Sequence, residues 1–276
     1  MLTVTFHGVR GSTPCHGPST AKYGGNTSCV SVRAPGRRPI LLDLGTGLRY
    51  FGKQYTAGTE IPLKAIALVT HLHWDHVQGL PFFTPMLHPG AKLEIFGPQQ
   101  SDGSSFASAM EEAISPPTFP IGLKDFPGNF SFSDVADAEW EMDDYKIMSR
   151  LVPHIGPTVG YRIEFAGSTI AYISDHQQPL DGSFHLPDGV RELAEGVDLL
   201  IHDSQYTPQE FAVKNNWGHC TADFAINIAA QTGAKRLALY HHDPDRTDTA
   251  IDAMATCGTG QPMDVFFARE GGTISV

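Results

Sequence analysis

The sequence lacks several features that mark large classes of protein. No run of about 18 apolar residues occurs, and the opening residues Met1–Phe6 contain no basic leader. Neither a membrane-spanning helix nor a secretion signal is therefore expected, and the predicted location is the cytoplasm. Lysine and arginine form no cluster, and 19 basic against 30 acidic residues give a net charge of −11. Because this charge repels phosphate backbones, long nucleic acids are not expected as partners.

Cysteine is also scarce. The four cysteines Cys15, Cys29, Cys220 and Cys257 lie far apart and form no CxxC pair. This spacing disfavours a disulfide scaffold and a thiolate zinc site, so we expect isolated buried thiols.

The residues that are present favour one packed α/β domain spanning residues 1–276. Hydrophobic residues make up 41% of the chain and charged residues 18%. A helix is expected over residues 222–232, with Thr221 as its cap and Gly233 at its end. Short apolar or alternating runs bounded by turn residues predict many strands, which are residues 2–6, 28–33, 40–44, 65–70, 92–96, 146–152, 158–164, 169–174, 198–202, 236–240, 264–267 and 273–276.

Within residues 98–145, the texture of the sequence changes between Ser101 and Phe132. A possible helix over residues 106–114 is followed by Pro116, Pro117, Pro120 and Pro127. This pattern is typical of a loop-rich insertion, and we expect it to act as a lid.

Histidine is abundant, with 13 residues, and three of them cluster. His71, His73, Asp75 and His76 place three imidazoles and a carboxylate within six residues, directly after the apolar run 65–69. On an extended segment His71 and His73 point the same way, whereas Asp75 and His76 fall on the next turn and can face a second ion. The motif therefore predicts two adjacent divalent metal ions.

One loop cannot surround two ions, so other strand ends must supply ligands. His154, Asp175 and His241 each follow an expected strand. Two neighbouring histidines are alternative ligands. His242 lies next to His241, and His176 lies next to Asp175.

These motifs together resemble the metallo-β-lactamase fold superfamily, and within it the ribonuclease Z and phosphodiesterase-like branch. The resemblance covers nearly the whole chain except residues 98–145. Its pieces are His71-Leu72-His73-Trp74-Asp75-His76, Leu151–Ile163 with His154 before Gly160-Tyr161, Ser174-Asp175, Trp217-Gly218-His219-Cys220-Thr221, Ala238-Leu239-Tyr240-His241, Gly8–Gly11, Gly24-Gly25-Asn26-Thr27-Ser28 and Asp43-Leu44-Gly45-Thr46-Gly47.

The resemblance implies an αββα sandwich with a dimetal site at one edge. It assigns His71, His73 and His154 to one ion, and Asp75, His76 and His241 to the other, with Asp175 bridging them. Zinc is the expected metal, with manganese and iron as alternatives.

Two metal ions suit hydrolysis of a phosphodiester or an acyl compound, with Asp75 accepting a proton from the attacking water. An alkoxide leaving a phosphate needs a proton donor, and His219 is the candidate. The resemblance implies that Asp203 pairs with His219.

We therefore expect a phosphodiesterase for a small substrate such as a cyclic nucleotide. Alternatives are a ribonuclease Z-like endonuclease on tRNA precursors, a thioester or lactone hydrolase, and a non-catalytic metal-stabilised binding module. The branch also implies a homodimer.

Overall fold

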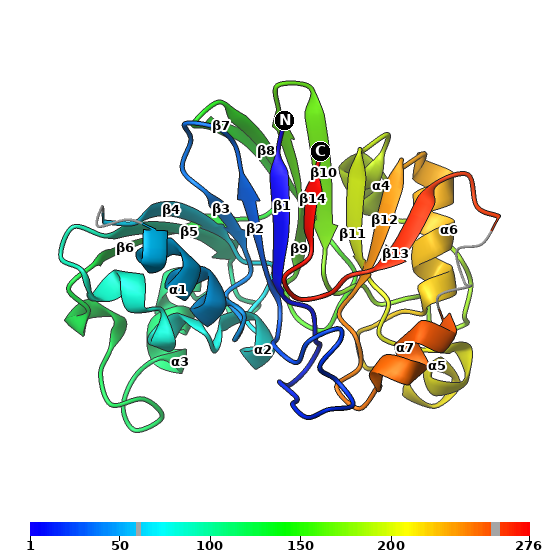
Figure 1. Ribbon diagram of the computed structural model, residues 1–276, viewed down its shortest axis with the longest axis horizontal. Helices are drawn as coiled ribbons and strands as arrows, with labels where there is room; N and C mark the ends of the chain where they lie inside the picture. The colour runs from blue at the N-terminus through cyan, green and yellow to red at the C-terminus, as the bar shows by residue number, and fades with distance from the viewer. Residues whose placement is uncertain (59–61, 255–259) are drawn as a thin grey trace.

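Two β-sheets packed face to face form the centre of the protein. The computed structural model describes residues 1–58, 62–254 and 260–276. Each sheet has seven strands, and helices cover the two outer faces, so the layers run helix, sheet, sheet, helix. Figure 1 shows both termini side by side at one end of the sandwich and α2 at the opposite end. The expected αββα sandwich is confirmed.

The first sheet combines antiparallel and parallel pairs in the order β14-β1-β2-β3-β4-β5-β6. From β3 onward its strands are parallel, so their carboxyl ends meet at one edge. Its strands are β1 (Thr3–Gly8), β2 (Cys29–Arg33), β3 (Ile40–Leu42), β4 (Lys64–Leu68), β5 (Lys92–Pro98), β6 (Asn129–Val135) and β14 (Thr273–Ser275).

The second sheet has the order β13-β12-β11-β10-β9-β8-β7. Strands β10 to β13 are parallel, whereas β7 to β10 are joined by antiparallel pairing. Its strands are β7 (Ala138–Met142), β8 (Tyr145–Leu151), β9 (Val159–Phe165), β10 (Ser168–Ile173), β11 (Leu199–Asp203), β12 (Arg236–Tyr240) and β13 (Asp264–Phe267).

The strands expected from the sequence are all present, with ends within two residues of those predicted. The helix α6 (Ala222–Thr232) has the expected bounds. Thr221 caps it by accepting a hydrogen bond from the Phe224 amide, and Gly233 ends it at a φ of 68°. The helix α4 (Asp188–Ala194) precedes β11, where the sequence predicts a helix-like stretch. Helices not expected from the sequence are α1 (Leu48–Gly58), α2 (Trp74–Val77), α5 (Pro208–Lys214) and α7 (Asp248–Met254).

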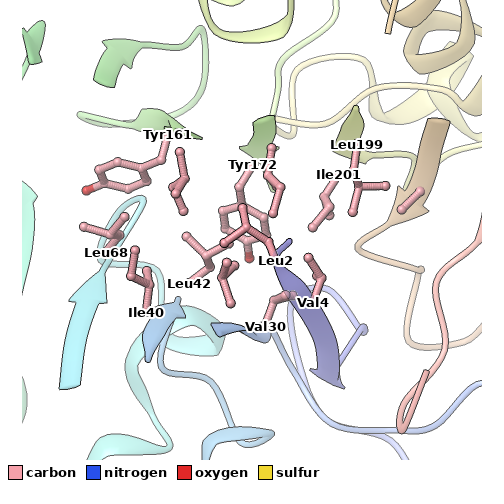
Figure 2. Packing of buried hydrophobic residues seen from close by; sticks show 14 of the residues in the cluster. Leu2, Val4, Val30, Ile40, Leu42, Leu68, Tyr161, Tyr172, Leu199 and Ile201 are labelled. Carbon is pink, nitrogen blue, oxygen red and sulfur yellow. The ribbon is translucent and has the colours of Figure 1, made fainter. Parts of the chain in front are cut away.

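Apolar side chains from both sheets fill the space between them. Figure 2 shows residues such as Leu42 and Val30 of the first sheet facing Tyr172 and Ile201 of the second. One further cluster lies between each sheet and its helices. The cluster of the first sheet includes Phe51, and that of the second includes Phe224. Because burial fixes both faces of each sheet, the strand ends that carry polar residues are held rigidly.

Up to residue 128 the segment 98–145 is rich in loops, as expected, but its second half is not. It contains the helix α3 (Phe106–Ala113), as expected, but β6 and β7 each extend one of the two sheets by an edge strand. The prolines made the segment resemble a loop, yet they lie before β6, in residues 116–127. Because β6 pairs in parallel with β5, residues 129–135 are part of the first sheet.

The expectation of isolated buried thiols is confirmed at two of the three described cysteines. Cys29 and Cys220 are buried free thiols, Cys15 is a half-buried one, and Cys257 lies outside the described residues. Among the described residues, no helix combines the length and apolar character that crossing a membrane requires.

Candidate metal centre

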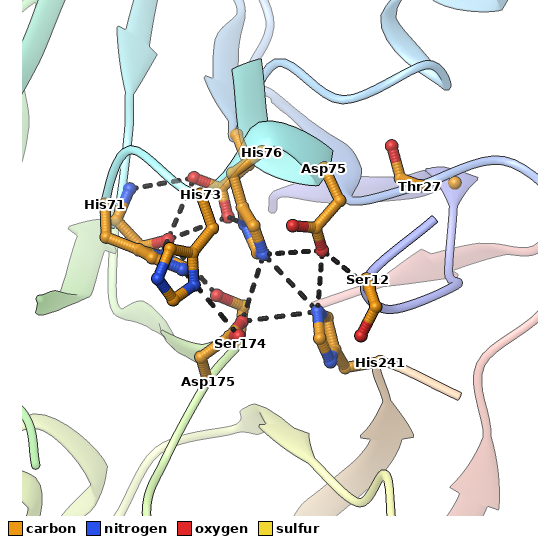
Figure 3. A network of polar contacts seen from close by, with 12 residues as sticks. Ser12, Thr27, His71, His73, Asp75, His76, Ser174, Asp175 and His241 are labelled. Carbon is orange, nitrogen blue, oxygen red and sulfur yellow. Dashed lines mark hydrogen bonds and ion pairs between the residues drawn. The ribbon is translucent and has the colours of Figure 1, made fainter. Parts of the chain in front are cut away.

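Seven histidine and aspartate side chains meet at the edge of the sandwich where the parallel strands end. His71 and His73 follow β4, and Asp75 and His76 lie on α2. His154, Asp175 and His241 follow β8, β10 and β12 of the other sheet. Figure 3 shows His76, Asp75, Asp175 and His241 turned toward one another across the gap between the two sheets.

The seven side chains divide into two groups that could each hold an ion. In the first, ligand atoms of His71, His73, His154 and Asp175 all lie within 4.8 Å of one another. In the second, those of Asp75, His76 and His241 do so. This division is the one that the resemblance implied.

Asp175 lies between the two groups. Its Oδ2 is 3.8 Å from Nε2 of His71 and 3.7 Å from Nε2 of His154. Its Oδ1 is 3.2 Å from Nε2 of His76 and 3.4 Å from Nε2 of His241. One carboxylate oxygen thus faces each group, as a bridging ligand requires.

The histidines are oriented by contacts at their other ring nitrogen. Nδ1 of His76 lies 2.8 Å from Oδ2 of Asp43, and Nδ1 of His154 lies 2.6 Å from the Gly218 carbonyl oxygen. Nδ1 of His241 lies 2.8 Å from Oε1 of Gln205. Because these partners are acceptors, Nδ1 carries the proton and Nε2 keeps a free lone pair.

The atoms at the centre fit divalent metal ions. Nε2 of His71 and Oδ1 of Asp175 are buried without a hydrogen-bond partner among the described residues. Nε2 of His76 faces Nε2 of His241 at 3.3 Å, an approach of two lone pairs that a cation between them would relieve. Imidazole and carboxylate donors without a thiolate suit zinc, manganese or iron.

The charge states of His71, His154 and Asp175 favour cation binding as well. His76 differs, because the carboxylates of Asp75, Asp175 and Asp43 outweigh burial and raise its pKa, so a bound cation would replace its proton. Burial, followed by the charge of His76, holds the pKa of His71 well below its usual range. Burial also lowers the pKa of His154 to about 4. For Asp175, the positive charge that His241 and His76 can carry outweighs burial and holds its pKa well below the usual range. Neutral imidazoles and ionised carboxylates are the forms that bind metals.

His219 lies beside this centre and contacts Asp203, as expected. Its Nδ1 is 3.0 Å from Oδ2 of Asp203 and 3.6 Å from Oδ2 of Asp175. Burial alone would lower the pKa of His219, but the Asp203 carboxylate outweighs burial and raises it. Ligand atoms of Asp175, His219 and His241 also lie within 4.8 Å of one another, so this position could take a ligand role as well.

The two histidines left open by the sequence point elsewhere. Nε2 of His242 lies 2.7 Å from the Ala268 carbonyl oxygen, and His242 belongs to neither group. Nδ1 of His176 faces Nε2 of His202 at 3.0 Å. Sequence spacing could not decide between His241 and His242, because the turn at His241, with its φ of 59°, sets which ring faces the centre.

Several residues around the centre were not singled out by the sequence. Asp43 orients His76, Gln205 orients His241, and the Ser12 amide donates to Oδ2 of Asp75 at 2.8 Å. Only Asp43 carried a signal, as part of the Asp43–Gly47 piece of the resemblance.

A pocket of about 310 Å³ opens onto the centre. Two tryptophans in its wall, Trp74 and Trp217, are 53% and 59% exposed. None of its lining residues comes from residues 98–145, so a lid role for that segment stays a prediction. The lining consists of Ser12, His73, Trp74, Asp75, Asp175, Tyr206, Trp217, His219 and His241.

Solved structures share this fold over the full chain. A diphosphatase from the PhnP family superposes with a TM-score of 0.74 at 19% identity, covering 100% of this chain and 98% of the other. The short form of human tRNase Z superposes with a TM-score of 0.65 at 23% identity, covering 99% of each chain.

Sequence relatives agree with the fold. A ribonuclease Z of Natronomonas pharaonis is 26% identical over 285 residues, covering 87% of this chain and 86% of the relative. An uncharacterized protein of Mycobacterium bovis is 28% identical over 263 residues, covering 92% of this chain and 86% of the relative. The model of the beta-lactamase superfamily domain matches residues 38–242. The chain therefore belongs to the beta-lactamase superfamily and has the metallo-β-lactamase fold.

Proposed function

We propose that the protein is a metal-dependent phosphodiesterase that hydrolyses a small phosphodiester such as a cyclic nucleotide. The observation that carries this proposal is the buried pair of His219 and Asp203 beside the two ligand groups. A proton donor next to a metal pair is what the alkoxide leaving group of a phosphodiester needs, whereas the thiolate released from a thioester departs without one.

The ligand groups would hold two divalent ions, with zinc as the proposed metal. Bound there, such ions supply an activated water molecule and positive charge for the phosphate oxygens. Asp75 is the proposed acceptor of the water's proton. Its Oδ2 is held by the Ser12 amide at 2.8 Å, which fixes the direction of the carboxylate.

His219 is the proposed donor to the departing oxygen. Asp203 accepts from its Nδ1, so Nε2 is the remaining nitrogen that can carry a transferable proton. Asp203 is itself fixed, because its Oδ2 accepts from the His176 amide at 3.1 Å and its Oδ1 from the Gln205 amide at 2.9 Å. The imidazole therefore has a defined orientation before substrate binds.

The walls of the pocket favour a substrate with a flat apolar part. Trp74 and Trp217 offer exposed ring faces, and such faces stack on nucleobases. Nζ of Lys214 lies 5.5 Å from the centre of the Trp217 ring, and it is also 3.6 Å from Oδ2 of Asp243. The volume of about 310 Å³ suits a single nucleotide better than a folded RNA.

A ribonuclease Z-like activity on tRNA precursors is the second candidate, and the relatives of that name favour it. The net charge of −11 opposes it, because tRNA binding requires a basic surface. The resemblance to ribonuclease Z also implies a protruding arm for an enzyme that acts on tRNA. Between Ile173 and Leu199 the chain forms only loops and the short helix α4, without such an arm.

Substrate screening with the metal-loaded protein separates the candidates. We expect turnover of cyclic nucleotides and bis(p-nitrophenyl) phosphate, with little cleavage of a precursor tRNA and none of a thioester or lactone panel. Efficient tRNA cleavage would replace the main proposal by the second. Failure of fully metal-loaded protein on every substrate would favour a metal-stabilised binding module.

A further inference from the structure

The metal centre is assembled from two sheets that do not share a hydrogen-bonded ladder. The first sheet supplies His71, His73, Asp75 and His76 through the segment after β4. The second sheet supplies the other ligands through the ends of β8, β10 and β12. The distances between the ligands therefore depend on how the sheets are placed relative to each other, and apolar contacts alone are weakly directional.

Three buried tyrosines of the second sheet bridge this gap just beneath the centre. The Tyr161 hydroxyl, from β9, donates to the Val69 carbonyl at 2.7 Å. The Tyr172 hydroxyl, from β10, donates to Oδ2 of Asp43 at 2.8 Å, and the Tyr240 hydroxyl, from β12, donates to the Gly8 carbonyl at 2.7 Å. All three side chains are completely buried.

Two of these acceptors lie next to segments of the first sheet that hold the centre. Val69 is two residues before His71 in the chain. Gly8 ends β1 and leads to Ser12, whose amide donates to Asp75. Each of these tyrosines thus ties the second sheet to a loop that positions a ligand of the first.

The third acceptor, Asp43, gives Tyr172 the most direct connection. Asp43 contacts Nδ1 of His76 through the same Oδ2 that accepts from Tyr172. Its Oδ1 accepts from the Thr70 amide at 2.8 Å, and Oγ1 of Thr70 lies 3.0 Å from Nδ1 of His71. The Tyr172 hydroxyl therefore bears on the orientation of two histidines in different ligand groups.

A fourth tyrosine makes a similar bridge far from the centre. The Tyr145 hydroxyl donates to the Arg38 carbonyl at 3.1 Å, also from the second sheet to the first. Tyr145 begins β8, whereas the ligand loop follows the end of that strand at Leu151. Six residues of extended strand separate the two positions, a distance of about 20 Å.

We propose that Tyr172, supported by Tyr161 and Tyr240, is a positioning residue of the metal centre. Its hydroxyl fixes Asp43, and Asp43 fixes the His76 ring in the direction that ligation requires. The proposal rests on the metal role proposed for His76. It assigns a positioning role to the hydroxyls of Tyr161, Tyr172 and Tyr240, and none to the hydroxyl of Tyr145.

The experiment compares Tyr172→Phe with Tyr145→Phe, since each removes one hydroxyl and keeps the ring. Zinc affinity is measured by competition with a chromophoric chelator, and the ligand field by the visible absorption of the cobalt-substituted protein. Tyr172→Phe is expected to weaken binding of the ion at Asp75, His76 and His241 about 10-fold, the low end of what loss of a contact to a metal-ligating residue costs. Tyr145→Phe is expected to keep wild-type affinity within about 2-fold and an unchanged cobalt spectrum.

Urea unfolding of the metal-free variants separates positioning from stability. Comparable losses in the two variants, together with an affinity loss confined to Tyr172→Phe, would support positioning. If Tyr172 acts through Asp43, adding Tyr172→Phe to Asp43→Asn should weaken metal binding no further than Asp43→Asn alone. Wild-type affinity in Tyr172→Phe, or equal affinity losses in both tyrosine variants, would overturn the proposal. A wild-type protein that binds no divalent ion would instead contradict the proposed function.

Discussion

Nδ1 of His219 lies 3.0 Å from Oδ2 of Asp203, the last residue of β11, and both side chains are buried beside Asp175. The pair joins residues that are 16 positions apart. It faces the pocket that opens onto the metal centre, so a bound substrate would meet His219 on the same side as Asp75.

The role of this pair can be tested through the leaving group. His219→Ala should slow hydrolysis of a cyclic nucleotide by about 10²- to 10⁴-fold, because an alkoxide departs poorly without a proton. The same variant should slow bis(p-nitrophenyl) phosphate only a few-fold, since p-nitrophenolate is stable as an anion. The measurement is kcat on both substrates at matched metal content.

Asp203→Asn is the matched control for this comparison. It keeps the shape of the side chain but weakens the contact with His219, so it should reproduce the same substrate pattern at smaller amplitude. Equal losses on both substrates would indicate a role in binding, and loss of metal from His219→Ala would make His219 a ligand.

Asp175 should be needed for both ions. Its two oxygens face different ligand groups, so Asp175→Ala is expected to lower the content of both metals and abolish hydrolysis. His241→Ala should lower mainly the content of the ion at Asp75, His76 and His241. Metal per chain is measured by elemental analysis after dialysis, with His242→Asn as control because its ring points to Ala268. Two ions per chain in Asp175→Ala would remove the bridging role.

Trp217 should contribute to recognition of the base. Stacking on one aromatic ring is worth about 1–3 kcal/mol, so Trp217→Ala should raise KM for a cyclic nucleotide about 5- to 150-fold with a smaller change in kcat. For a ribose cyclic phosphate without a base, KM should stay near the wild-type value. Tyr50→Ala, at an exposed aromatic position on α1, is the control for unspecific effects. An equal rise in KM for both substrates would contradict stacking.

The sequence was sufficient to predict which seven side chains meet at the sheet edge, because each lies shortly after a recognisable strand or on the short helix that follows one. Apolar runs such as β12 have a local signature, and a polar residue directly after the run, such as His241, belongs to the sheet edge. The Tyr172–Asp43 contact has no such signature, since its partners are 129 positions apart and meet only when the sheets pack. Strands β6 and β7 were not predicted although apolar and polar residues alternate in both, because the prolines just before β6 made the segment resemble a loop.

Acid sensitivity should come partly from a histidine outside the metal centre. His7 lies on β1 with its Nε2 2.8 Å from Oγ of Ser31 and its ring edge-on to Phe51 at 5.5 Å. Burial, with a smaller contribution from Arg33, lowers the pKa of His7 from 6.5 to about 4. The unfolded chain therefore binds this proton below pH 6.5, whereas the folded protein binds it only near pH 4. The free energy of unfolding should fall as the pH drops through this window and stay unaffected above it.

At pH 5, protonation of His7 in the unfolded chain is expected to lower the free energy of unfolding by about 2 kcal/mol, and His7→Gln should remove this loss. The measurement is urea unfolding of metal-free wild type and His7→Gln between pH 7.5 and pH 5. The variant starts from a lower stability at pH 7.5, because it disturbs the packing on Phe51, but it should lose less on acidification. Histidines of the metal centre contribute equally to both proteins and cancel in the comparison. The exposed His16, changed to Gln, should keep the wild-type slope. Parallel stability curves for wild type and His7→Gln would show that His7 is protonated equally in the folded and unfolded states, against the effect that its burial should have.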